Sequence, residues 1–162
     1  GHVITYLGDI SKGTLTEEQT KTLVGLMAAA NDLENIGDII ETDLVHLGNE
    51  RLEQDITISQ ATRDVLTKLH KVTSEATSMA ISAIRDNDLE TAQQVIGLKS
   101  DISLMMDSAA THQALRLVAD EPGRLEAYTL EIDVIEKLKR IYYFAKRMAK
   151  TLAPEETEEH AE

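Results

Sequence analysis

Four polar residues in the first third of the chain have the spacing of one helix face. They are Asn31, Glu34, Asp38 and Glu41. Residues three or four positions apart lie side by side on a helix, so this stripe predicts a ladder of oxygen ligands. The nearest cations along the chain from its centre are Lys21 and Arg51, so no neighbour in sequence neutralises it.

Glu34 and Asp38 are the best placed of these residues to hold a metal ion. Carboxylates at i and i+4 can chelate a hard cation such as magnesium, calcium or manganese, and they also suit iron. Two ligands on one helix do not complete a site, so a facing helix must supply Asp9 or Asp101. The alternative is that both acids hydrogen-bond across a bundle or face solvent.

The histidines give weaker indications. Asp43 and His46 have the i, i+3 spacing of di-iron bundles, but those need a Glu-x-x-His pair twice, so we expect His46 on the surface. His70 and His112 are isolated, and we expect His112 to be structural. We find no glycine-rich phosphate loop and no nucleophile with a plausible base, so we do not expect an enzyme.

The helix that positions the acidic stripe has a heptad pattern. Leucine or isoleucine recurs every seven residues, with a second line beside it. The two lines are Leu26, Leu33, Ile40 and Leu47, and Leu23, Ala30, Gly37 and Leu44. Such a pattern predicts a seam that packs along another helix. A glycine inside a helix costs about 1 kcal/mol relative to alanine, and a close helix approach would explain Gly37.

Composition places the chain among helical bundles. It has 162 residues, of which 42% are hydrophobic but only 3% aromatic, and it contains no cysteine. The net charge is −13, and five of these charges lie in the last eight residues, which predicts an acidic disordered tail over 154–162. The acidic balance argues against nucleic acid as a partner and against adsorption to anionic lipid.

Periodicity and capping signals predict five helices. We expect them over residues 3–12, 16–47, 57–86, 87 to about 117, and 124–152. Capping boxes at Thr57 with Gln60 and at Asn87 with Glu90 set two of the starts. Short turns between long helices predict an all-α antiparallel bundle, in one domain over 1–153.

A faint internal repeat divides this domain. Leu33-Glu34-x-x-x-Asp38 aligns with Ile135-Glu136-x-x-x-Arg140 at an offset of 102 residues. The unit is a short helix, a turn and a long helix, and the third predicted helix opens the second copy. The first copy lacks its opening helix, and the chain starts inside an amphipathic pattern without a cap. We therefore expect the domain to be truncated at its N-terminus.

The segment 31–41, NDLENIGDIIE, resembles the signature of PhoU-like domains. The resemblance covers about residues 3–152 and implies tandem three-helix repeats with the first helix missing. The segment from Met105 through His112 to Leu117, with Ile132-Asp133 and 138–141, is most similar to the PhoU domain at the C-terminus of sodium/phosphate cotransporters.

The resemblance implies a regulatory function. We expect a cytoplasmic domain of a bacterial inner-membrane protein that modulates phosphate transport and homeostasis, with the membrane domain of the same polypeptide as its partner. A homodimer is a second expected partner arrangement. The alternatives are a stand-alone PhoU-type regulator of an ABC phosphate transporter, a metal-binding helical bundle and a plain dimerisation bundle.

The same family can hold multinuclear iron clusters through Glu/Asp-x-x-x-Asp pairs. Only Glu34 and Asp38 match that motif here. Arg140 stands where the second motif needs an acid, and Met105 follows Asp101 at i+4. No cofactor is therefore established, and iron or another divalent metal is the candidate, bound by Glu34 and Asp38 with Asp101 as a further ligand.

The last predicted helix contains most of the cations and aromatic residues. Its basic cluster consists of Lys137, Lys139, Arg140, Lys146, Arg147 and Lys150. These side chains either meet phosphate or lipid headgroups or form a solvated face paired with neighbouring acids. The run Tyr142-Tyr143-Phe144 is more typical of a core or an oligomer contact than of a cofactor site.

Overall fold

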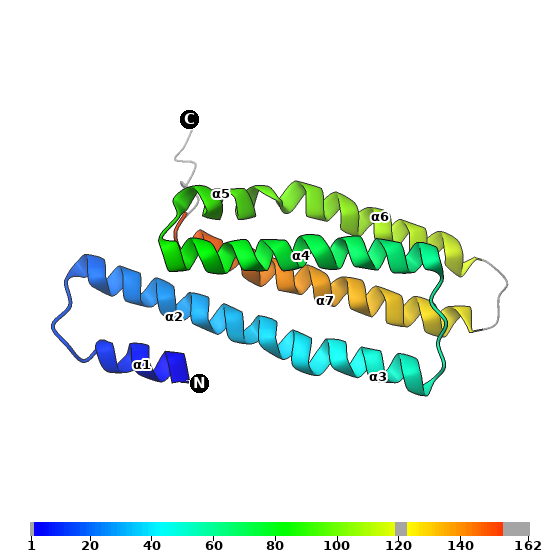
Figure 1. The fold of residues 1–162 in the computed structure, drawn as a ribbon, viewed down its shortest axis with the longest axis horizontal. Coiled ribbons are helices and arrows are strands. Elements are labelled where there is room, and N and C mark those ends of the chain that lie inside the picture. Colours follow the sequence, from blue (N-terminus) through cyan, green and yellow to red (C-terminus); the bar gives the residue numbers. More distant parts are fainter. Residues whose placement is uncertain (1, 119–122, 154–162) are drawn as a thin grey trace, which may run out of the picture.

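The protein is an all-α helical bundle (Figure 1). The computed structural model describes residues 2–118 and 123–153, and within these ranges every regular element is a helix. In chain order they are α1 (His2–Ile10), α2 (Glu17–Asp38), the π-helical segment η1 (Ile39–Leu44), α3 (Val45–Glu53), α4 (Gln60–Asp86), α5 (Leu89–Gly97), α6 (Lys99–Leu117) and α7 (Arg124–Lys150). The predicted fold class is confirmed. The predicted tail over 154–162 lies outside the described residues. So do residues 119–122, between the fourth and fifth predicted helices.

α7 is the central helix of the bundle. It packs against α2, α4, α5 and α6, whereas α1 packs on α2. In Figure 1, α4 and α7 lie between α2 and α6. α2 and α4 therefore both lie against α7 without forming a major interface with each other.

The helices α2, α4 and α5 begin at capping residues, but two of the predicted starts are wrong. The predicted start at residue 16 is confirmed, and there Thr16 caps α2 through a reciprocal capping box with Gln19. The predicted starts at Thr57 and Asn87 are wrong, because Ser59 caps α4 and Asp88 caps α5. Asn87 instead ends α4 with a φ of 53°, in the left-handed region that asparagine tolerates.

Two helix boundaries also differ from the prediction. Helical structure does not stop near Leu47 but continues through η1 and α3 to Glu53. Gly48 does not end it, since buried Leu47 anchors this turn and outweighs a glycine cost of about 1 kcal/mol. The predicted fourth helix is two helices, because the chain changes direction at Leu98 between α5 and α6.

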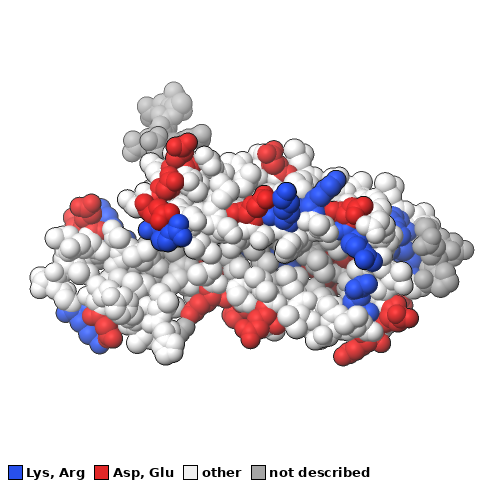
Figure 2. All heavy atoms as spheres, viewed as in Figure 1, with Lys and Arg blue, Asp and Glu red and all other residues white. Residues whose placement is uncertain are grey.

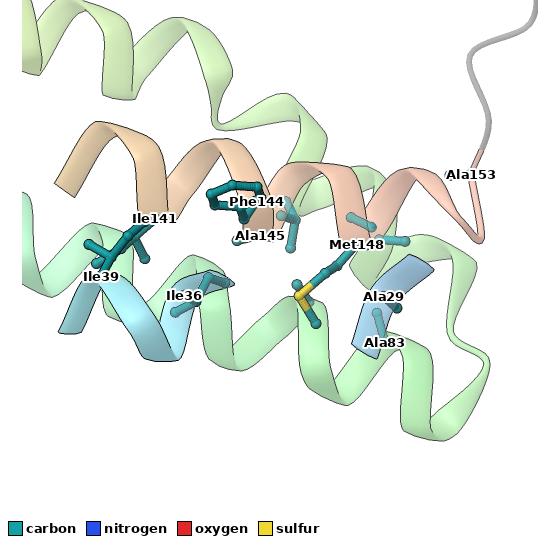
Figure 3. Close-up of a cluster of buried hydrophobic side chains, with 13 residues drawn as sticks. Ala29, Ile36, Ile39, Ala83, Ile141, Phe144, Ala145, Met148 and Ala153 are labelled. Atoms are coloured by element: carbon teal, nitrogen blue, oxygen red, sulfur yellow. The ribbon is translucent and has the colours of Figure 1, made fainter. Parts of the chain in front are cut away.

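Small side chains allow α7 to approach its neighbours closely. Figure 3 shows this part of the core, where α2, α4, α5 and α7 meet. Its fully buried alanines are Ala80, Ala83, Ala92, Ala145 and Ala149. A second cluster with larger side chains joins α4, α6 and α7. Close packing at alanines leaves little room for added methylenes in the first cluster.

The aromatic run of α7 divides between core and surface. Tyr142 and Phe144 are buried, while Tyr143 is half exposed. The Tyr142 hydroxyl donates a hydrogen bond to the Val95 carbonyl at 3.0 Å, and burial raises the pKa of Tyr142 to about 12. For Tyr142 and Phe144, the core interpretation is therefore correct.

α2 is rotated relative to the predicted seam. The buried stripe of α2 consists of Ala29, Asp32 and Ile36, and it continues into η1 through Ile39 and half-buried Asp43. By contrast, Leu26, Leu33 and Ile40 are 38%, 42% and 49% exposed. The prediction that these three residues form the core seam is wrong, although Leu23 and Leu47 of the same pattern are buried. The two aspartates hid the real stripe, because a search for apolar spacing passes over them.

Gly37 does not mark a close helix approach. It is exposed, and a Cβ added there would meet no atom within 4 Å. The predicted close approach at Gly37 is therefore wrong, and the residue lies on an open face of α2.

Candidate functional site

Two cations of α7 form ion pairs with the two aspartates of the buried stripe, Asp32 of α2 and Asp43 of η1. Arg147 Nε lies 3.3 Å from Asp32 Oδ2, and Lys137 Nζ lies 2.8 Å from Asp43 Oδ2. The Arg147 guanidinium also lies over the rings of Tyr143 and Phe144, at 5.7 and 5.8 Å from their centroids. For Lys137 and Arg147, the structure thus supports pairing with acids over a free phosphate-binding role.

Asp32 is incompletely satisfied in this position. It is 1% exposed, and its Oδ1 has no hydrogen-bond partner. Burial raises the pKa of Asp32, and the nearby Arg147 only partly opposes this shift. Folding therefore disfavours the charged carboxylate of Asp32 relative to its protonated form.

The raised pKa of Asp32 predicts that the stability of the Asp32→Asn variant relative to the parent chain depends on pH. A raised pKa means that Asp32 contributes stability below its unfolded pKa, near 3.8, and that this contribution is lost as pH rises through the higher folded pKa. At neutral pH we expect Asp32→Asn to unfold at the same or higher urea concentration than the parent chain. Below about pH 4, the parent should gain relative to the variant. Urea titrations of both proteins across this range test it, and a parent advantage confined to neutral pH would contradict it.

The predicted metal ligands do not converge. Glu34 and Asp38 lie together on the exposed side of α2, whereas Asp101 is exposed on α6, across the bundle. Asp9, on α1, pairs with Lys12 at 2.6 Å. Among residues 2–118 and 123–153, no group of three or more histidines and acids is arranged to hold a metal ion. The pair on α2 therefore has no third ligand in the part of the chain described here, and iron or divalent-metal binding stays a prediction.

The three histidines considered as candidate ligands differ in burial. His46 and His70 are exposed, as expected for His46, while His112 is partly buried with its Nε2 atom unpaired. No described histidine joins the acids of α2 in a metal-ligating cluster.

A buried polar network at the other end of α7 was missed by the sequence analysis. Arg124 Nη2 donates to Glu131 Oε2 at 2.9 Å and to Gln113 Oε1 at 3.1 Å. Glu131 and Gln113 are fully buried. The signal was available, since Arg124 and Glu131 are seven residues apart on the buried face of α7. An acid at such a position predicts a buried partner.

The network continues into the start of α4. Gln113 Nε2 donates to Thr62 Oγ1 at 3.3 Å, and Arg116 Nη1 donates to the same oxygen at 2.8 Å and also to the Ser59 hydroxyl. Ser59 is the residue that caps α4. The bonds therefore tie α4, α6 and α7 to one another, which is a structural role.

Two hollows, of about 270 and 190 Å³, follow one another between the α2–η1 segment and α4. The first is lined by Val3, Leu7, Leu26, Ala29, Ala30, Leu33, Ile81, Ile84, Arg85 and Met148. The second is lined by Ile36, Ile40, Leu44, His70, Thr73, Ser74, Thr77, Ser78, Leu138 and Ile141. α7 contributes to both hollows, and we refer to them together as the α2–α4 groove.

The residues of the sequence signature lie along this groove. Leu33 and Ile40 line it, whereas Glu34 and Asp38 lie on the next, exposed stripe of α2. Comparisons with family models, curated proteins and solved structures found no match. The PhoU-like resemblance therefore rests only on the sequence segments from which it was inferred, and it stays a prediction.

A final observation concerns membranes. Within the described ranges, no helix is both long and apolar enough to cross a bilayer. The α2–α4 groove combines an apolar lining with exposed leucine and isoleucine side chains of the signature segment, and it is our candidate functional site.

Proposed function

We propose that this chain is a regulatory PhoU-like domain that modulates sodium-dependent phosphate transport. It would dock on the cytoplasmic face of the membrane domain of the same polypeptide. The supporting observation is that the signature segment exposes Leu33 and Ile40 beside the α2–α4 groove instead of burying them in the core. Apolar side chains that do not contribute to the core are available to a partner.

The proposed mechanism is a shift between transporter conformations. A docked domain changes this equilibrium only if it binds one conformation more tightly than the other. A tenfold difference in affinity corresponds to about 1.4 kcal/mol, which is small beside the contacts that a groove of this length can make. Regulation by this route needs no reacting group in the domain.

The alternatives differ in what they require. A stand-alone regulator of an ABC phosphate transporter would use the same surface on a separate partner protein. Several hydrophobic segments upstream of Gly1 in the gene would favour the cotransporter. A metal-binding bundle requires a third ligand for Glu34 and Asp38, which the described residues do not supply.

Phosphate uptake by cells that express the full polypeptide tests the proposal. Replacing Leu33 and Ile40 by glutamate should change the response of uptake to phosphate supply, because charge in the groove opposes apolar docking. Both residues are partly exposed, so the fold should persist. The matched control is Leu104→Glu, at an exposed leucine of α6 outside the groove. An identical response in the groove variant and the control would contradict the proposal.

A further inference from the structure

The α2 wall of the groove has the pattern of half a coiled coil. Leu26, Ala30, Leu33, Gly37 and Ile40 follow one another at alternating spacings of four and three residues. Large residues alternate with small ones, which gives ridges and holes for side chains of a facing helix. This stripe lies beside the one that packs on α7, so α2 has two adjacent packing faces and only one is fully buried.

The groove has the length of a helix-binding site. One wall runs from Leu26 of α2 to Leu44 of η1, which at 1.5 Å per residue is about 27 Å. The opposite wall is α4, from His70 to Arg85, and α1 closes one end through Val3 and Leu7. An apolar channel of this shape suits an amphipathic helix that lays its apolar side into it.

The charge around the groove distinguishes between possible helices. Asp38 and Glu41 are exposed beside the apolar stripe, and residues 22–50 contain no lysine or arginine. On α4, the groove wall contains the hydroxyl residues Ser74, Thr77 and Ser78, and the cation among its described lining residues, Arg85, is already paired with Asp86 at 2.7 Å. Figure 2 shows acidic side chains on the lower edge of the face in view, near the middle of the molecule. A helix in the groove is therefore favoured if it has basic residues beside its apolar stripe.

The same charges disfavour two other occupants. A second copy that paired α2 with α2 would bring its own acids against Asp38 and Glu41, which is repulsive. An anionic lipid surface would likewise be repelled by this rim.

We infer that the α2–α4 groove binds a basic amphipathic helix, with leucine or isoleucine in its apolar stripe and lysine or arginine in the flanking positions. The inference rests on the proposed function in taking α2 as a docking surface, and it adds the chemistry of the partner. It does not require the partner to belong to a phosphate transporter.

The test uses two labelled peptides about three heptads long, with identical leucine and isoleucine stripes. One has lysine and the other glutamate at the flanking positions. Fluorescence anisotropy with the full 162-residue chain should show at least about tenfold tighter binding of the lysine peptide, weakened by added salt. Equal affinities, or no binding of the lysine peptide, would overturn the inference.

Two sets of variants locate the binding. Leu33→Ala with Ile40→Ala should weaken lysine-peptide binding, whereas Leu104→Ala on α6 should not. Asp38→Lys with Glu41→Lys should reverse the preference, so that the glutamate peptide binds more tightly. Circular dichroism melts establish that each variant is folded. Binding that is equally sensitive at Leu104, or insensitive to the charge reversal, would place the peptide elsewhere and refute the inference.

Sedimentation of the parent chain supplies a further outcome. A dimer that is lost in the Leu33→Ala, Ile40→Ala variant would show that a second copy occupies the groove, and would overturn the inference. The proposed function is judged separately by uptake. Peptide binding without any effect of groove variants on uptake would refute the function alone, and an uptake effect without peptide binding would refute this inference alone.

Discussion

Replacing Arg124 by methionine should lower the free energy of unfolding by about 3–5 kcal/mol, because it leaves the fully buried Glu131 without its cation. Glu131 Oε1 already has no hydrogen-bond partner, so Arg124 supplies the bond to the other oxygen. Gln113 Oε1 would lose its donor as well. Urea unfolding followed by circular dichroism measures the loss.

The double variant Arg124→Met, Glu131→Leu is the control for this prediction. It removes both charges and leaves none to be desolvated, so most of the lost stability should return. Lys12→Met, at an exposed ion pair with Asp9, should change stability by less than about 1 kcal/mol. A single Arg124 variant as stable as Lys12→Met would show that the pair contributes little to the fold.

The parts of the fold that could be predicted from the sequence depend on local signals. The start of α2 was predicted at residue 16, and apolar spacing along α4 and α7 predicted two long helices. Thr57 and Ser59 both precede α4, and the local capping-box pattern selected Thr57, which is wrong. Ser59 is favoured in the folded protein, where Arg116 of α6 donates to its hydroxyl. That contact joins residues 57 positions apart, so no local window contains it.

The prediction of which face of α2 is buried was wrong for a related reason. Two stripes with the same spacing lie side by side on this helix, and the more apolar one was taken as the core. The stripe that is actually buried includes Asp32 and Asp43, which become tolerable only beside Arg147 and Lys137 of α7. The basic cluster and the acidic stripe were both visible in the sequence, but their pairing requires the position of α7.

The acidic pair on α2 and the α2–α4 groove differ in how much of each could be predicted from the sequence. The acids Glu34 and Asp38 were correctly placed on one helix face, because i, i+4 spacing determines this. Whether a third ligand joins them depends on which helices are neighbours, and α6 with Asp101 is not a major neighbour of α2. The groove could not be predicted at all, since it arises from two helices that both pack on a third.

The rotation of α2 leads to a final prediction, in which the same side chain is inserted on two faces of the bundle. Ala145→Leu should lower the free energy of unfolding by about 1–3 kcal/mol, because Ala145 is fully buried among the alanines around α7. Gly37→Leu should not destabilise the chain. A Cβ at Gly37 meets open space, and replacing a helix-interior glycine with leucine improves helix propensity by somewhat under 1 kcal/mol.

Thermal and urea unfolding of the two variants beside the parent measures both changes. Gly37→Ala adds a matched control, since it gives the helix-propensity gain of about 1 kcal/mol without filling the groove. The heptad prediction would have placed Gly37 against a neighbouring helix, so leucine there would separate the helices. A destabilised Gly37→Leu with a stabilised Gly37→Ala would thus show that α2 packs through its heptad seam. A tolerated Gly37→Leu and a destabilised Ala145→Leu are expected if the open groove lies on that seam.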